Sequence, residues 1–220
     1  MENVKKLEPA FQGTVVVASR FLVLARQARE EESTLEDLHV ENLHATGTDF
    51  STLALRRVSF RHCRFVDCDW SGVELEDVIA EHCDWSASRL TGVRWHGCRW
   101  TDCKGVGFDC SDGILHRSSF TNCNFLSTNF KGSTFKQVSF VQTDLTGAQL
   151  SQCRWKDLTF SHCKLAEASF FRTAMGGLDV TTCQIDGLIL SQSGEELRGL
   201  IVDPLQAAAL ARRLGLVIRP

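Results

Sequence analysis

The chain has 220 residues, a net charge of −3, ten cysteines and a hydrophobic fraction of 43%. Near balance of charge excludes a polycation built for nucleic acid and a disordered polyanion, and there is no run of eighteen apolar residues for a membrane span. Because a chain that starts Met1-Glu2-Asn3 shows no secretory leader, ten cysteines favour a reducing compartment, and we expect a cytoplasmic protein.

Residues 1–32 precede the regular part of the sequence and are expected to form an N-terminal cap. Residues 14–32 predict an amphipathic helix. Its apolar face contains Val17, Phe21, Leu24 and Ala28. The β-branched run at 15–17 also permits a strand in the first part of this segment. The favoured prediction is a helix that covers the first repeat.

From Leu35 to Leu190 a large residue recurs at every fifth position, and 31 of these 32 positions are apolar. Neither the 3.6-residue period of a helix nor the two-residue period of a strand produces this series. The position two residues earlier carries mostly Cys, Val, Ser, Thr, Ala and Leu, and the position two residues later carries nine glycines, which suit tight turns. One large and one small inward side chain per turn predict a chain that coils around its own axis.

Segments such as 118–122, 123–127 and 143–147 resemble the A(D/N)LXX pentapeptide repeat. The resemblance implies an all-β fold: a right-handed quadrilateral β-helix over residues 33–192, with twenty residues per coil and about eight coils. Residues twenty apart should then stack, and their volumes are compensated along the axis. Ala80 falls between Phe60 and Trp100, and Gly105 falls between Trp85 and Phe125.

Nine of the ten cysteines occupy the small inward position, and Cys63, Cys83, Cys103 and Cys123 are predicted to form one column. A metal or redox site is the alternative, but the chain has no Cys-x-x-Cys pair, and buried cysteine serves well as a small apolar filler. All seven histidines point outward, with pairs such as His96 and His116 on adjacent coils, which favours a solvated face. Without catalytic or phosphate-binding motifs, we expect no enzyme, no catalytic residue, no metal and no cofactor.

Residues 193–220 are predicted to form a C-terminal helical cap. Asp203 suits the N-cap, Pro204 the first helical position and Gly215 the position after the helix, with a possible short strand at 216–218. The apolar helix either caps a monomer or forms a two-fold dimer contact. The candidate dimer interface contains Leu205, Ala209, Leu210, Leu214, Leu216 and Ile218.

The tail from Leu197 to Ala208 resembles the C-terminal module of Qnr-type and MfpA-type proteins. That resemblance implies a tail-to-tail homodimer that binds DNA gyrase, with topoisomerase IV as a second candidate, and protects it from fluoroquinolones or related poisons. Because the register is unbroken from 35 to 190, the chain lacks the projecting loops of some Qnr proteins and is nearer to the loopless MfpA type.

Charge is unevenly distributed along the repeats. From Glu30 to Asp84 there are four bases and fourteen acids, 4 − 14 = −10, whereas residues 85–190 have a balance of +3. A rigid rod of carboxylates can mimic the phosphates of DNA for a topoisomerase; the alternative is that the acids only maintain solubility. The candidate topoisomerase-facing acids are Asp67, Asp69, Glu74, Glu76, Asp77, Glu81 and Asp84.

Two observations keep other interpretations open. Arg89, Arg94, Arg99 and Lys104 occupy successive outward positions and would surround one coil with positive charge, which counts against simple mimicry. The competing hypothesis is a scaffold that binds an unrelated protein through outward apolar residues, among them Leu126 and Phe171. Drug resistance, immunity to a toxin and regulation of DNA topology all remain open as the natural role.

Overall fold

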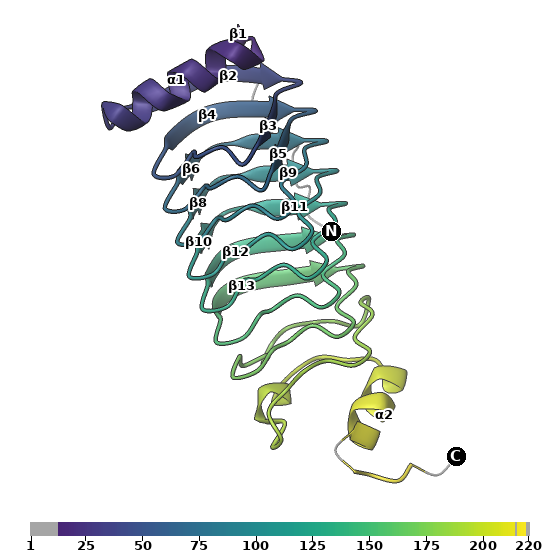
Figure 1. Ribbon diagram of the computed structural model, residues 1–220. Helices are drawn as coiled ribbons and strands as arrows, with labels where there is room; N and C mark the ends of the chain where they lie inside the picture. The colour runs from purple at the N-terminus through teal and green to yellow at the C-terminus, as the bar shows by residue number, and fades with distance from the viewer. Residues whose placement is uncertain (1–12, 214, 219–220) are drawn as a thin grey trace.

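A computed structural model describes residues 13–213 and 215–218. They form an elongated β-solenoid with one helix at each end (Figure 1). The strands are β1 (Thr14–Val16), β2 (Thr34–Glu41), β3 (His44–Thr46), β4 (Ala54–Arg61), β5 (Arg64–Val66), β6 (Glu74–Glu76), β7 (Ile79–Glu81), β8 (Arg94–His96), β9 (Arg99–Thr101), β10 (Ile114–His116), β11 (Ser119–Thr121), β12 (Thr134–Val141) and β13 (Arg154–Ser161). The helices are α1 (Ala18–Glu30), the 3-10 turn η1 (Glu195–Leu197) and α2 (Pro204–Arg213).

The coils stack in parallel, and within the repeats each paired residue lies twenty positions from its partner, as in Phe120↔Phe140 and Phe140↔Phe160. The predicted twenty-residue coil is confirmed. We number the four sides by their first residues: face 1 starts at 34–37, face 2 at 39–42, face 3 at 44–47 and face 4 at 49–52, each repeating every twenty residues. Counted down each face at twenty-residue intervals, the paired repeats number seven on faces 1 and 2 and eight on faces 3 and 4. The number of coils is therefore close to the expected eight.

The large position of each repeat fills the interior of the solenoid. Trp70, Trp85, Trp95 and Trp100 are at most 1% exposed, and rings stack along the axis, with Phe120 and Phe140 centroids 4.9 Å apart at 14°. Burying one such ring contributes about 1.5–3 kcal/mol. The continuous aromatic column therefore supplies much of the driving force for coiling.

The small position has a chemical role besides filling space. Its hydroxyl or thiol donates to the carbonyl of a large-position residue 23 positions earlier, as from Ser88 Oγ to Phe65 O and from Cys63 Sγ to Val40 O at 3.4 Å. All ten cysteines are free and buried, as the structural-filler interpretation predicts. Burial raises the pKa of Cys98 to about 12, so this thiol stays protonated.

The turn between faces requires a positive φ at the position where the sequence places glycine. All nine of these glycines have positive φ, for example +67° at Gly92, and non-glycine residues adopt it elsewhere, such as Ala87 at +56°. On faces 3 and 4 an Asp or Asn often stabilises the following turn: Asp69 Oδ1 accepts the Ser71 N–H at 2.9 Å, and Asp84 Oδ1 accepts the Ser86 N–H at 3.0 Å. Such side-chain bonds replace part of a strand ladder, and these two faces contain mostly isolated bridges.

The N-terminal helix is shorter than the predicted 14–32. Residues Thr14–Val16 pair with β2 as strand β1, and α1 begins at Ala18 and ends at Glu30. The edge of β2 offers these β-branched residues a parallel partner, which a helix would not use. Phe21 is fully buried, with its ring 5.5 Å from that of Phe60 in an edge-to-face contact, whereas Val17 is 67% exposed and lies off the predicted apolar face.

At the C-terminal end, the predicted N-cap is confirmed and has a reciprocal partner. Asp203 Oδ1 accepts the Gln206 N–H at 2.8 Å, and Gln206 Oε1 accepts the Asp203 N–H at 2.9 Å, a capping box. Buried Gln206 also donates from Nε2 to the carbonyls of Val180 and Cys183, which fixes α2 against the last coil. Gly215 has φ +85° as expected. The possible strand at 216–218 is absent from the structure: these residues pair with no strand, and the Leu216 amide donates to the Ala211 carbonyl of α2 at 3.0 Å.

Candidate interaction surface

The seven predicted topoisomerase-facing acids do not gather on one side of the rod. The twenty-residue register distributes them over all four faces and two of the corners. Glu74 and Glu76 lie on face 1, Glu81 on face 2, Asp84 on face 3 and Asp69 on face 4, with Asp77 and Asp67 at corners. A flat DNA-binding surface would therefore meet only a few of them at once.

Five of these acids form ion pairs with arginines one coil away. The N–O distances are 2.7 Å for Glu74–Arg94, 2.8 Å for Glu76–Arg56, 2.7 Å for Glu81–Arg61, 3.1 Å for Asp69–Arg89 and 3.8 Å for Asp84–Arg64. The cationic ring expected around Arg89 and Arg94 is thus partly neutralised by the coil above it. Within the described residues, Asp67 and Asp77 have no ion-pair partner; both occupy positive-φ corners, where Asp is tolerated well.

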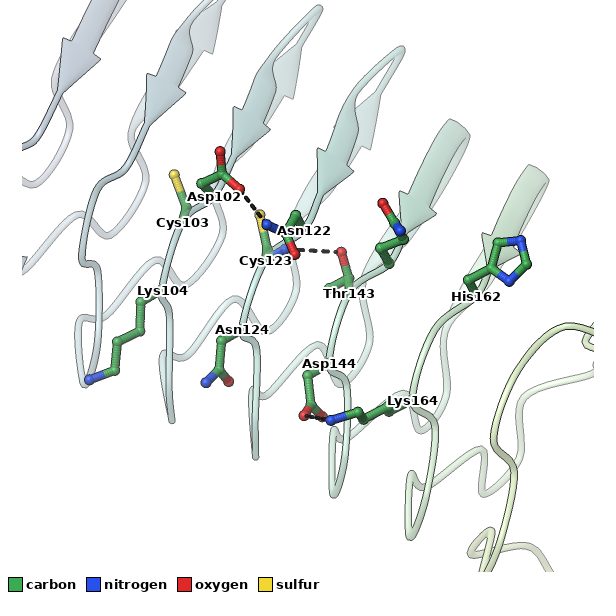
Figure 2. Close-up of a pocket in the computed structure, with 11 residues that line it drawn as sticks. Asp102, Cys103, Lys104, Asn122, Cys123, Asn124, Thr143, Asp144, His162 and Lys164 are labelled. Atoms are coloured by element: carbon green, nitrogen blue, oxygen red, sulfur yellow. Dashed lines mark hydrogen bonds and ion pairs between the residues drawn. The ribbon is translucent and has the colours of Figure 1, made fainter.

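A polar hollow of about 720 Å³ lies where faces 2 and 3 meet (Figure 2). Asn122 donates to Asp102, and Lys164 Nζ lies 3.3 Å from Asp144 Oδ2. Burial alone would raise the pKa of Asp144, but hydrogen bonds from Thr146 and Lys164 outweigh burial and hold it below its usual value. These two bonded pairs already satisfy each other's polar groups, so they connect adjacent coils rather than await a ligand.

The outward histidines stack as the spacing predicts. The rings of His62 and His82 are parallel with centroids 5.0 Å apart, and Nδ1 of His96 lies 3.1 Å from Nδ1 of His116. Among the described residues, no three His, Cys, Asp or Glu side chains are placed to hold a metal ion.

The lower half of face 1 is basic, which the sequence reasoning missed. Lys136, Arg154 and Lys156 lie on the last two strands of this face, and Arg117 lies at its corner one coil above. None of the four has an ion-pair partner in the described part of the chain. Aligning the residues at twenty-residue intervals would have revealed this patch. The unpaired charge of the rod is therefore positive here, whereas much of its negative charge is paired.

Below β13 the solenoid opens into a groove of about 1260 Å³, bounded by Arg154, Trp155, Lys156, Arg172, Gly176 and Arg198. Trp155 is only half-buried, unlike the other tryptophans, and its indole Nε1 donates to the Ala174 carbonyl at 2.8 Å. In a regular coil the backbone amide of the large residue donates to the carbonyl 19 positions later, as from Phe65 N to Asp84 O. At Trp155 the indole takes the place of the amide as the donor to the next coil.

The predicted dimer interface is exposed at the C-terminal end. Leu205 is 84% exposed, Leu216 61% and Ile218 42%. Ala209 is exposed, Leu210 is half-buried, and Leu214 lies outside the described residues. Among the described helices, none combines the length and apolar character needed to cross a membrane.

Comparisons with known proteins agree with the repeat geometry. Residues 93–170 and 113–190 match the model of a pentapeptide repeat region, and no curated protein matches the sequence. Full-length QnrB1, a plasmid-mediated fluoroquinolone resistance protein, superposes with a TM-score of 0.50 and 22% identity over 81% of this chain and 91% of that one. HetL, involved in heterocyst differentiation regulation in Nostoc sp. strain PCC 7120, gives a TM-score of 0.31 and 12% identity over 85% of this chain and 97% of that one.

The likeness to QnrB1 concerns the fold, since identity is low. It agrees with two features of this chain: an inward residue at every fifth position and parallel pairing of residues twenty positions apart. By its period, its stacking and the match over residues 93–190, this chain is a pentapeptide-repeat protein whose solenoid resembles that of QnrB1.

Proposed function

We propose that this protein is a non-enzymatic interaction protein that binds the type II topoisomerase DNA gyrase as a DNA mimic. In this role it modulates the enzyme or protects it from quinolone-like inhibitors, and topoisomerase IV is a second target. The fold likeness to a fluoroquinolone resistance protein and the tail motif support the proposal. It implies a cytoplasmic protein, because gyrase acts there.

The observation that carries the proposal is the excess of ten acids over bases between Glu30 and Asp84, held on a rigid rod. The ion pairs there do not remove these carboxylates from reach: the side chains of Glu74 and Glu76 are 56% and 49% exposed. Exposed ion pairs contribute only about 0–1 kcal/mol each. Lys and Arg side chains on the DNA-binding surface of the enzyme could therefore replace Arg94 and Arg56 as ion-pair partners of these two carboxylates, at little cost in free energy.

The test is a gyrase supercoiling and cleavage assay with a fluoroquinolone, with and without the protein. Neutralising the seven candidate acids to Asn and Gln should abolish protection, whereas neutralising the exposed lower-coil acids Glu167, Asp186 and Glu195 should not. Both variants must retain the β-sheet circular dichroism of the wild type. A protein that neither binds gyrase nor changes drug-stabilised cleavage would eliminate the proposal.

A scaffold with an unrelated protein partner is the second candidate. The outward residues Leu126 and Phe171 are each 38% exposed, which provides apolar contact points away from the acidic coils. A partner that depends on these two residues and is indifferent to the acids would favour this alternative.

A further inference from the structure

Strand β13 is a free edge within the solenoid, and it is the last strand arrow along the rod in Figure 1. Down face 1, each coil donates an amide to the carbonyl 21 residues earlier: Ile114 N to Val93 O at 2.8 Å, Thr134 N to Gly113 O at 2.8 Å and Arg154 N to Ser133 O at 3.1 Å. The next step, from Ala174 N to Cys153 O, is missing among the described residues. The ladder stops at β13.

The lower edge of β13 consequently has unused backbone donors. On face 1 the amides of Arg154 and Lys156 point up towards β12, so those of Trp155 and Asp157 point down. The positive-φ corner at Asp157 shifts this alternation by one residue. On face 2 the amide of Ser139, the partner of Thr159, donates upward to Ser118 O, so the Thr159 amide points up and that of Phe160 points down. None of the three downward amides has a hydrogen-bond partner within residues 13–213 and 215–218. Below them, the amides of Ala174 and Gly176, which would point up in a regular coil, donate to no carbonyl along β13 within the described residues. The downward amides of Met175 and Gly177 donate to the Glu196 and Gly199 carbonyls of the tail, so this coil is paired with the tail but not with β13.

Side chains hold this opening in place. Besides the bond from Trp155 Nε1 to Ala174 O, the His162 amide donates to Thr182 Oγ1 at 3.0 Å rather than to a backbone carbonyl. Faces 3 and 4 remain paired through Lys164↔Gln184 and Ser169↔Ile189. The two coils are therefore separated on faces 1 and 2 and remain paired on faces 3 and 4, and we call the opening between them the wedge.

The charges around the wedge indicate what it would accept. Arg154 and Lys156 project outward from β13 on either side of Trp155, and Arg172 and Arg198 lie on the groove's other walls. The acids there are Asp157, Glu195 and Glu196. Glu196 is buried, and its carboxylate already accepts bonds from the amides of Arg172 and Ser191 and from the Ser191 hydroxyl, which leaves the cations in excess.

We infer that the free edge of β13 binds an extended acidic segment of a partner protein by β-strand addition. The segment's backbone bonds to the amides of Trp155, Asp157 and Phe160, and acidic side chains at alternate positions lie beside Arg154 and Lys156. A groove of about 1260 Å³ exceeds the space that a drug-sized ligand needs. This inference does not depend on gyrase binding, because it concerns the opposite end of the rod from the acidic coils.

The test uses fluorescence anisotropy with the full chain and a labelled peptide of alternating glutamate and valine. Binding should weaken about tenfold when alternate peptide amides are N-methylated. This change keeps the charge and removes the peptide donors to the free carbonyls along this edge, such as that of Cys153. Arg154→Glu combined with Lys156→Glu should abolish binding of this peptide and create binding of the lysine–valine counterpart. Lys104→Glu combined with Lys131→Glu, on faces 3 and 4, is the matched control. It should change the affinity neither for the glutamate–valine peptide nor for the lysine–valine peptide.

Hydrogen exchange supplies a second readout. The amides of Trp155, Asp157 and Phe160 should exchange rapidly in the free protein and become protected when the glutamate–valine peptide is bound. If the N-methylated peptide, or a single-stranded oligonucleotide of equal charge, binds as tightly, the groove is a general polyanion site and the strand-addition proposal is wrong. Unchanged exchange at these three amides would overturn it equally.

Discussion

Phe108 occupies the space that Gly105 leaves empty in the core: a β-carbon added to Gly105 would lie 2.2 Å from Cδ1 of Phe108. Gly105 stands at a large position and Phe108 at a small one, so the two have exchanged volumes within a single coil. The twenty-residue spacing alone predicts that Trp85 and Phe125, its neighbours along the axis, fill the space at Gly105. The main compensation comes instead from three residues further along the chain.

This exchange predicts strong coupling between the two positions. Gly105→Leu alone should destabilise the protein by about 1–3 kcal/mol through overpacking, and Phe108→Ala alone by about 3–5 kcal/mol through a cavity. The double variant restores the usual large and small order and should be more stable than the sum of the two effects predicts, measured by urea unfolding. Additive losses would contradict the exchange of volumes.

The positive-φ corners predict opposite effects for two reciprocal substitutions. At Gly92, φ is +67° and an added β-carbon meets nothing within 4 Å, so Gly92→Ala should cost about 1 kcal/mol from the backbone alone. At Ala87, φ is +56°, and Ala87→Gly should stabilise the protein by up to about 1 kcal/mol. Midpoints of urea unfolding measure both. Loss of stability in Ala87→Gly would show that backbone strain does not control these corners.

The five-residue period was enough to predict the interior, because a fixed register places each large residue over the one twenty positions earlier. The stacking of Phe120 on Phe140 follows from it directly. The same register could have predicted ion pairs such as Glu74–Arg94, which also lie twenty apart. It could not predict the wedge below β13, since Trp155 keeps the regular spacing. Whether the indole ring packs inside the solenoid or turns out between two coils depends on the space that neighbouring side chains leave in the core. It also depends on the Ala174 carbonyl, which accepts a hydrogen bond from the indole Nε1.

Gln206 should be the residue on which docking of α2 depends most. Its Nε2 bonds to the Val180 and Cys183 carbonyls at 2.9 and 2.8 Å. Gln206→Ala leaves the Cys183 carbonyl without a partner and removes one of the two donors to the Val180 carbonyl, which also accepts from the Cys183 amide at 2.8 Å. Gln206→Glu offers neither carbonyl a donor, so each substitution should cost about 1–3 kcal/mol. Hydrogen exchange within α2 should accelerate in both variants, whereas Gln192→Ala, at an exposed position, serves as the control. Equal protection in all three proteins would refute the anchoring role.

Cys98 predicts how stability falls at alkaline pH. Burial raises its folded-state pKa from 9.0 to about 12, so the folded protein binds a proton that the unfolded chain releases. Its contribution is complete below pH 9 and declines as pH rises from 9 to about 12, by about 1.4 kcal/mol per pH unit. Cys98→Ser keeps a donor for the Leu75 carbonyl, which the thiol now contacts at 3.4 Å, and removes the titrating thiol. The stability difference between the variant and the wild type should therefore be constant below pH 9 and shift in favour of the variant above it; parallel curves would contradict the pKa shift.

The exposed C-terminal leucines make dimerisation testable separately from gyrase binding. Leu205 is 84% exposed, and burying it with Leu210 against a second copy would remove apolar surface from water. The molar mass of the wild-type protein measured by light scattering should be twice the 24.5 kDa of one chain. Leu205→Asp combined with Leu210→Asp should yield the single-chain mass. Val15→Asp combined with Val23→Asp changes two exposed apolar residues at the other end of the rod and should leave the dimer intact. A wild-type monomer, or dissociation by the N-terminal pair, would show that the tail is only a cap.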